Sequence, residues 1–204
     1  MLTTAVLALL FAAEPGREII HLADWHWISE AAFVADGGAT DDYPALLDKV
    51  DAIQREQMEA LRELKAKTVW IEGESDDTID GFFRHIETLK AVKVPKGDSL
   101  SDQVVRDLYR ENMLQIGAAG RLLLAGEIDD VLPLEDHAAW RRANPIKSGK
   151  IEIDQAANDE RERAMVRRLL KSERAVIVLG ADHDLRKHVP ETVKYRVVRV
   201  KGLP

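Results

Sequence analysis

The sequence contains no cysteine among its 204 residues. This absence excludes disulfide bonds, thiolate metal ligands, iron–sulfur clusters and a cysteine nucleophile. Basic residues are in the minority, with 29 Lys and Arg against 36 Asp and Glu, which gives a formal net charge of −7. Nucleic-acid-binding proteins usually present a basic face, so the acidic balance argues against a nucleic-acid partner. Any chemistry must come from imidazole, carboxylate, hydroxyl or guanidinium groups.

The chain also lacks internal repeats, low-complexity stretches and any Pro-, Gly- or Ser-rich linker long enough to separate two domains. A chain of about 100–200 residues can form one complete hydrophobic core. The apolar content of 46% is too high for a disordered chain. We therefore expect a single domain over residues 17–204.

Residues 1–13 form an apolar segment with eleven apolar and no charged side chains. The run is too short to span the ~30 Å hydrocarbon core of a bilayer. It is typical of the apolar part of a secretory signal, so we expect export to the periplasm or the medium. A misassigned start codon and a buried N-terminal element are the alternatives. No second long apolar run and no cysteine for lipidation follow, so we expect no stable membrane anchor.

Strand-like and helix-like segments alternate along the rest of the chain. Short apolar runs predict strands at Glu18–Asp24, 68–73, Asp130–Glu135, 174–181 and 194–200, the last alternating as an edge strand does. Apolar spacing of three and four residues predicts helices at 44–67, 76–90, 100–127 (broken at Gly117 or Gly120) and 155–172. Segments 35–43 and 143–150 are interpreted as loops. The alternation favours an α/β fold with a mainly parallel central sheet flanked by helices, the long helices forming a cap.

Acids and histidines follow the ends of the predicted parallel strands. They are Asp24 and His26, Glu72 and Glu74, Glu135, Asp136 and His137, and Asp182 and His183. Ligands of open parallel sheets bind outside the carboxyl ends of the strands, so we expect these side chains to share one site. Helix capping is the alternative explanation for some of the acids.

This donor set suits a divalent cation such as Mn, Zn, Fe or Co. We predict that His26, His183 and Glu135 bind the metal, which would activate a water and polarise a carbonyl. Glu72 or Asp24 would then act as general base. Without a metal, His26 or His183 would deprotonate water while an acid orients the imidazole.

Three further residues carry predictions of their own. Arg161 lies four residues from both Ala157 and Met165, so it shares a helix face with them. We predict that Arg161 contacts a site carboxylate or an anionic ligand; a side chain reaching solvent is the alternative. We expect His21 to be a core histidine and His188 to be solvated.

Five short motifs follow one another along residues 17–185. They are ADWH at 23–26, WIEGE at 70–74, LPLED at 132–136, NDERERAM at 158–165 and VLGADH at 178–183. Their order and spacing resemble the superfamily that joins the Tiki/TraB-type proteins, the ChaN-like haem-binding lipoproteins and the erythromycin esterases. Two positions depart from the pattern, with Ala23 where glycine is usual and Asp24 where glutamate is usual. The resemblance implicates His26, Glu72, Arg161 and His183, and also Asp24 and Glu135.

Members of that superfamily include metal-dependent proteases, lactone-opening esterases and haem-binding proteins, so the resemblance does not fix one function. We expect an exported hydrolase that cleaves an ester or amide in a small molecule or a peptide. The first alternative is a haem- or iron-binding protein in which His26 ligates iron, Trp25 or Trp27 stacks on the macrocycle and Arg161 pairs with a propionate. The second is a degenerate family member that only scaffolds a partner, with the named side chains pointing away from one another.

Overall fold

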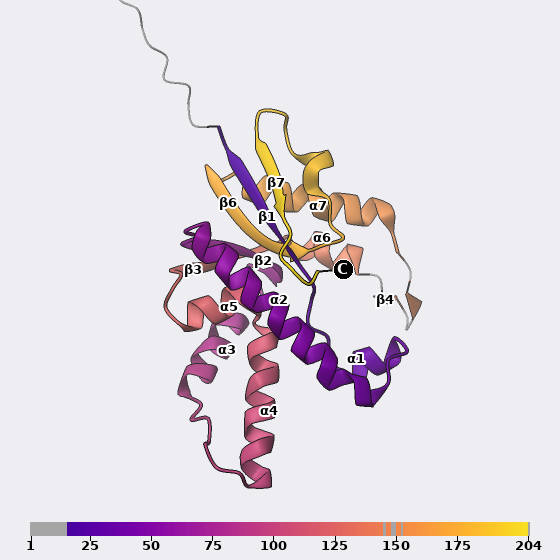
Figure 1. The fold of residues 1–204 in the computed structure, drawn as a ribbon. Coiled ribbons are helices and arrows are strands. Elements are labelled where there is room, and N and C mark those ends of the chain that lie inside the picture. The colour runs from indigo at the N-terminus through magenta and orange to yellow at the C-terminus, as the bar shows by residue number, and fades with distance from the viewer. Residues whose placement is uncertain (1–15, 145, 148–149, 152, 204) are drawn as a thin grey trace, which may run out of the picture.

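The computed structural model describes residues 16–144, 146–147, 150–151 and 153–203. The predicted signal segment, residues 1–13, lies outside the described residues. Five parallel strands form one sheet in the order β3-β2-β6-β1-β7, and helices pack around it (Figure 1). The predicted α/β fold is therefore confirmed. Within the described part of the chain, no helix has the length and apolar character needed to cross a membrane.

The strands of this sheet agree closely with the predicted runs. They are β1 (Glu18–Asp24), β2 (Thr68–Ser75), β3 (Asp130–Glu135), β6 (Arg174–Gly180) and β7 (Lys194–Val198). β7 pairs with β1 and lies at the edge of the sheet, as its alternating sequence predicts.

The main helices are α2 (Tyr43–Glu63), α3 (Ile79–Ala91), α4 (Leu100–Gln115), α5 (Gly117–Leu124) and α7 (Gln155–Leu169). The predicted break in the 100–127 segment occurs at Gly117, where a φ of +67° favours glycine. The side chain of Ser99 caps the start of α4 by accepting a hydrogen bond from a backbone N–H, and Asp154 does the same for α7.

Several short elements were not predicted. They are α1 (Glu30–Ala35), α6 (His137–Ala143), two 3-10 turns, η1 (Thr40–Asp42) and η2 (Leu185–His188), and an antiparallel pair, β4 (Ile146–Lys147) and β5 (Lys150–Ile151). The interpretation of 35–43 and 143–150 as loops is therefore wrong in part. Elements of two to seven residues are too short to show a period in the sequence. Asp136 caps α6 through Oδ1, so capping accounts for this acid after β3.

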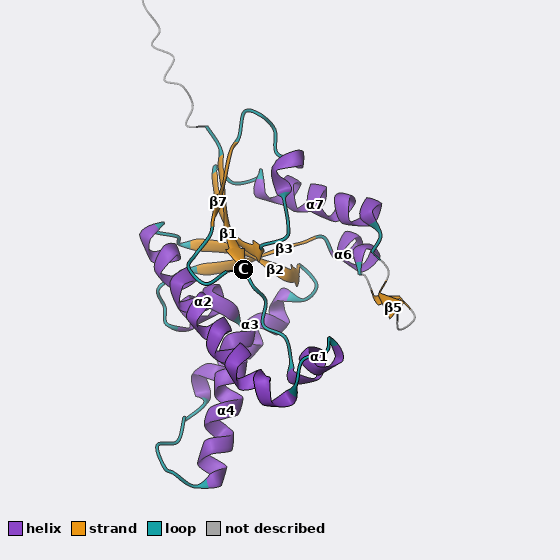
Figure 2. Cartoon of the chain, turned by 45° about the vertical axis from the view of Figure 1, so that its right-hand side comes forward, coloured by secondary structure: helices purple, strands orange, loops and turns teal. Residues whose placement is uncertain are grey.

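Apolar side chains pack on both faces of the sheet. On one face, Leu61 of α2 and Leu122 of α5 share a buried cluster with Ile20 of β1. On the other face, Met165 of α7 shares a cluster with Ile19. Successive residues of a strand point to opposite faces, so β1 contributes to both clusters. Figure 2 shows the corresponding layers, with α2 and α3 on one side of the sheet and α6 and α7 on the other.

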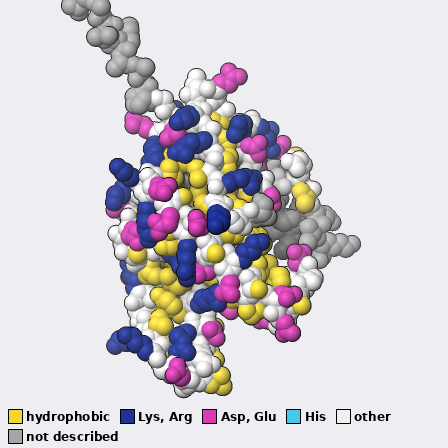
Figure 3. Space-filling model, viewed as in Figure 1, with side chains coloured by type: hydrophobic (Ala, Val, Ile, Leu, Met, Phe, Trp, Pro, Cys, Tyr) yellow, Lys and Arg dark blue, Asp and Glu magenta, His cyan; other side chains and the backbone are white. Residues whose placement is uncertain are grey.

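The carboxyl ends of β1, β2 and β6 lie at the same edge of the sheet because these strands are parallel and adjacent. Side chains of α3 and of the α4–α5 junction line a cleft at this edge, which matches the predicted helical cap. Acidic and basic side chains are interspersed over the face of the molecule in Figure 3. The fold thus leaves the strand ends as the place where the predicted polar residues meet.

Candidate functional site

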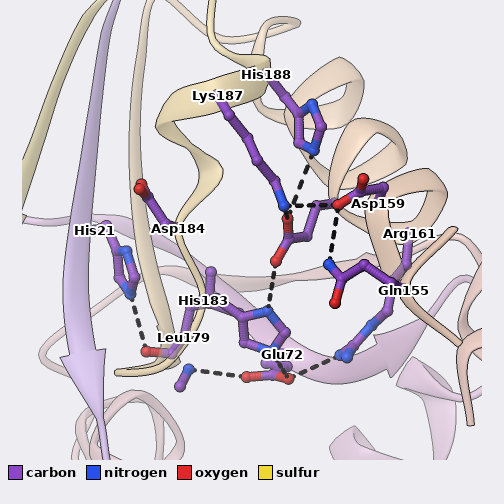
Figure 4. A network of polar contacts seen from close by, with 12 residues as sticks. His21, Glu72, Gln155, Asp159, Arg161, Leu179, His183, Asp184, Lys187 and His188 are labelled. Atoms are coloured by element: carbon purple, nitrogen blue, oxygen red, sulfur yellow. Dashed lines mark hydrogen bonds and ion pairs between the residues drawn. The ribbon is translucent and has the colours of Figure 1, made fainter. Parts of the chain in front are cut away.

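Glu72, near the end of β2, is the centre of a polar network. The Nε2 atom of His26 lies 2.9 Å from its Oε2, and Nε2 of His183 lies 3.1 Å from its Oε1. The backbone N–H of Gly180 donates to Oε2 at 2.9 Å, and Nη2 of Arg161 donates to Oε1 at 2.7 Å. Each oxygen of the carboxylate therefore faces two nitrogen atoms. Figure 4 shows Glu72 between His183 and the guanidinium that reaches down from α7.

The two imidazoles are each held by a second carboxylate. Nδ1 of His26 lies 3.1 Å from Oδ2 of Asp24, and Nδ1 of His183 lies 3.1 Å from Oε1 of Glu162 on α7. Gln57 of α2 donates to Oδ1 of Asp24 at 2.7 Å and so fixes that carboxylate. Both rings have a carboxylate at each nitrogen, which fixes their orientation.

Arg161 joins Glu72 to Glu135, whose side chain is fully buried at the end of β3. Its Nε donates to Oε2 of Glu135 at 3.0 Å, and its Nη2 contacts both Oε1 of Glu135 and Oε1 of Glu72. Arg161 thus makes the carboxylate contacts that its position in the sequence predicts.

The structure brings the six predicted catalytic and metal-binding residues into one connected network, while His137, also expected there, contacts Ser75 instead. The six residues are Asp24, His26, Glu72, Glu135, Arg161 and His183. A protein that only scaffolds a partner was expected to point these side chains apart. Their direct contacts contradict that expectation.

Sequence reasoning missed Glu162 and Gln57. Both lie on apolar helix faces: Glu162 is three residues before the buried Met165, and Gln57 is four residues from both Ile53 and Leu61. A polar residue within an apolar helical stripe was the signal that could have identified each of them. Buried polar side chains of this kind require hydrogen-bond partners, which here are Asp24 and His183.

The predictions for two other histidines, His21 and His188, differ in their outcome. His21 is a core histidine, as predicted: Nδ1 lies 2.8 Å from the Tyr195 hydroxyl and Nε2 lies 3.0 Å from the Leu179 carbonyl. His188 was expected to be solvated, and this is wrong, because its side chain is only 9% exposed. The 3-10 turn η2, which the sequence did not predict, packs His188 against α7.

The network sets the charges of its members. Hydrogen bonds to Asp24 and Glu72 raise the pKa of His26 to about 10, against the opposing effect of burial. Burial lowers the pKa of His183, but its hydrogen bonds to Glu162 and Glu72 outweigh this and raise the pKa to about 9. Burial would raise the pKa of Glu72, yet the hydrogen bonds from both imidazoles hold it well below its usual value. Both rings are therefore imidazolium cations at neutral pH.

His26 lies between two cavities. One, of about 120 Å³, is walled by Phe82 of α3 and Ile116 at the α4–α5 junction. The other, of about 240 Å³, is walled by Trp25 and by the residues that follow β6. Asp24, His26 and Glu72 line both cavities. The His26 side chain is 49% exposed, against 22% for His183, so it is the more accessible of the two imidazoles.

The predicted metal ligands His26, His183 and Glu135 do not converge on one point. The carboxylate of Glu135 is bound to Arg161, and the two histidines contact different oxygens of Glu72. Nη2 of Arg161 also contacts the Glu72 carboxylate, so the three predicted ligands do not form one ligand set in this arrangement.

In comparisons with known proteins, no protein-family model matches the sequence, and no curated protein and no solved structure matches it. The resemblance to the Tiki/TraB, ChaN-like and erythromycin esterase superfamily therefore stays an expectation, and the function has to be argued from the site.

Proposed function

We propose that the protein is an exported hydrolase that cleaves an ester or amide bond in the cleft at the carboxyl ends of β1, β2 and β6. The observation that carries the proposal is His26, a half-exposed imidazolium held between two carboxylates at the wall shared by two cavities. The apolar segment 1–13 is what supports export.

His26 is suited to act as the general acid. Its raised pKa keeps both ring nitrogens protonated at neutral pH, and a substrate in the cavity accepts one N–H in place of the carboxylate that holds it in the free protein. Asp24 and Glu72 orient the ring and stabilise its charge. In this role His26 donates a proton to the departing alcohol or amine as the bond to the carbonyl carbon breaks.

Glu74 is suited to act as the general base. It lines the same cavity as His26, and it makes no hydrogen bond or ion pair with any residue that the structure describes. Glu72, by contrast, has donors on both oxygens and a strongly lowered pKa, which make it a poor base. Glu74 therefore takes the proton of the attacking water, and the acid–base pair needs no metal ion.

The walls of the cleft indicate the kind of substrate. Ile71, Phe82 and Ile116 supply apolar surface beside the carboxylates. Ligand pockets usually enclose about 300–1,000 Å³, whereas the cavity with these walls measures about 120 Å³ and the one on the other side of His26 about 240 Å³. A small ester, a lactone or one peptide unit of a longer chain fits these dimensions.

The test compares hydrolysis by the wild type with that by His26→Gln and Glu74→Gln. The substrates are short-chain p-nitrophenyl esters, lactones and a peptide library. Loss of a general acid or base lowers the rate about 100-fold or more, so we expect both variants to lose at least that much kcat/KM. His85→Gln, on α3 and outside the network, is the matched control. Full turnover by His26→Gln, or no turnover of any substrate by the wild type, would contradict the proposal.

The haem-binding alternative has one supporting observation, namely that Trp25 and His26 line the same cavity. Against it, both ring nitrogens of His26 are engaged with carboxylates, and Arg161 is bound to Glu135 and Glu72 rather than free to pair with a propionate. Titration with haemin separates the two proposals. The hydrolase proposal predicts no Soret shift at micromolar protein, and a saturable shift that His26→Gln removes would favour haem binding.

A further inference from the structure

A second group of ligand-type side chains lies behind His183, on the side away from the cleft. Asp159 and Glu162 of α7 and His188 of η2 place donor atoms within 4.8 Å of one another. The two acids share a helix face because they are three residues apart. Figure 4 shows His188 and Lys187 extending from η2 towards Asp159 on α7. Among the residues that the structure describes, this is the one group of three that meets this distance criterion.

One of the donor atoms, Nε2 of His188, is buried without a hydrogen bond to any residue that the structure describes. The side chains of His188 and Glu162 are each only 9% exposed, and Oε2 of Glu162 has the ammonium group of Lys187 as its partner. Nε2 of His188 and Oε2 of Glu162 face each other at 3.5 Å, which is longer than a normal N–H···O hydrogen bond. Buried polar atoms without hydrogen bonds are uncommon and costly, so Nε2 of His188, aimed at two carboxylates, indicates a place for a ligand.

A positively charged side chain, that of Lys187, already contacts both carboxylates of this group. Nζ of Lys187 lies 2.6 Å from Oδ1 of Asp159 and 2.9 Å from Oε2 of Glu162. The Lys187 side chain is 45% exposed, so it can turn into solvent without breaking core packing. The ammonium group neutralises the two carboxylates, but among the described residues neither it nor any other donor makes a hydrogen bond to Nε2 of His188.

We propose that Asp159, Glu162 and His188 form a binding site for a divalent first-row transition cation, Mn²⁺ or Zn²⁺, which displaces Lys187. Two carboxylates with one imidazole suit these ions, whereas Mg²⁺ favours oxygen ligands alone. Three protein ligands leave further positions for water. This site is distinct from the ligand set predicted from the sequence, because it contains neither His26, His183 nor Glu135.

Glu162 connects this site to the proposed catalytic network. Its Oε1 holds Nδ1 of His183, while its Oε2 faces His188. A cation at Oε2 would fix Glu162 and tie η2 to α7, and thereby hold the ring of His183 in place. Cation binding does not depend on the protein being a hydrolase, so the two proposals can fail separately.

The experiment measures Mn²⁺ binding to the full chain after chelator treatment, from the loss of the free-ion electron paramagnetic resonance signal, with Zn²⁺ as competitor. We expect one Mn²⁺ per chain in the wild type and binding at least about tenfold weaker in His188→Gln and in Asp159→Asn. Lys187→Met, which removes the competing ammonium, should bind more tightly. The melting temperature should rise with Mn²⁺ in the wild type and not in His188→Gln.

Glu160→Gln is the matched control, because Glu160 lies on the same helix and pairs with Arg142 instead. His26→Gln should also bind Mn²⁺ as the wild type does. The proposal is overturned if neither ion binds below about 1 mM. It is equally overturned if His188→Gln binds like the wild type, or if His26→Gln alone loses the ion, which would place the cation at Glu72.

Discussion

At the scale of single residues, Arg161 makes the contact on which the buried side of the network depends. Glu135 is fully buried and has its carboxylate bound by Arg161, which also contacts Glu72. Taking a carboxylate out of water is costly, and the charge is tolerated only while its partner is present. Removal of the guanidinium would leave the carboxylates of Glu135 and Glu72 without this positively charged partner.

We therefore predict that Arg161→Met lowers the free energy of unfolding by about 3–5 kcal/mol, measured by urea denaturation. The double variant with Glu135→Gln should recover part of that loss, because one buried charge is then removed as well.

Arg168→Met is the control on the same helix. Arg168 pairs with Asp76, whose side chain is 73% exposed, and exposed pairs contribute about 0–1 kcal/mol. An equal loss of unfolding free energy in Arg161→Met and Arg168→Met would show that the buried contact stabilises the fold no more than the exposed pair does.

At the scale of elements, the network depends on how closely the end of β6 approaches β1 and β2. A Cβ atom built on Gly180 would lie 2.9 Å from Nε2 of His26 and 3.3 Å from Oε2 of Glu72. The colliding atom of His26 is at the end of a half-exposed side chain, which can move aside. A methyl group at this position would therefore displace His26 rather than the backbone.

We predict that Gly180→Ala changes the free energy of unfolding by less than about 1 kcal/mol while hydrolysis falls at least about tenfold, because His26 loses its contact with Glu72. Gly81→Ala is the control, since its added Cβ would meet only Arg84 at 3.9 Å. Wild-type rates in Gly180→Ala would contradict the assigned role of the His26–Glu72 contact.

The elements also show how far the sequence could predict this protein. The apolar runs of β1 and β3 identify both strands to the residue, and the strand-end rule correctly brings His26, Glu72 and His183 together. The rule concerns edges of a sheet, so it could not say which nitrogen meets which oxygen. Glu135 was expected to lie with the histidines as a metal ligand, but its carboxylate is instead bound by the side chain of Arg161.

The short elements could not be predicted for a different reason. α1 has no buried residue, so it produces no apolar stripe. η2 is four residues long, and only its packing against α7 shows that His188 is buried. The second ligand group depends on this turn. The sequence pattern therefore missed α1 and the burial of His188, because neither produces a local apolar period.

At the scale of the whole molecule, the charges of the network couple stability to pH. The pKa of His183 is raised from 6.5 to about 9, so the folded state binds a proton that the unfolded state has released. Its contribution to stability is complete below pH about 6.5 and is lost as the pH rises towards 9. Glu72 has a lowered pKa, so its contribution is present above about pH 4.5 and is lost in acid.

We predict that the melting temperature of the wild type falls between about pH 6.5 and 9, and that His183→Gln shows a smaller fall over the same range. Circular dichroism melts of the two proteins in matched buffers measure the difference. His85→Gln should behave as the wild type does. Parallel curves for the wild type and His183→Gln would show that His183 does not carry this coupling.

The most direct test of the account is the pKa of His26, because the proposed acid role requires Asp24 and Glu72 to keep its ring protonated. Long-range ¹H–¹⁵N spectra of the histidine side chains across the pH range measure this value, with the signal assigned by its absence in His26→Gln. We predict a midpoint of about 10, and Asp24→Asn should lower it. A midpoint near the ordinary value of about 6.5 would contradict the central claim that two carboxylates hold His26 as an imidazolium.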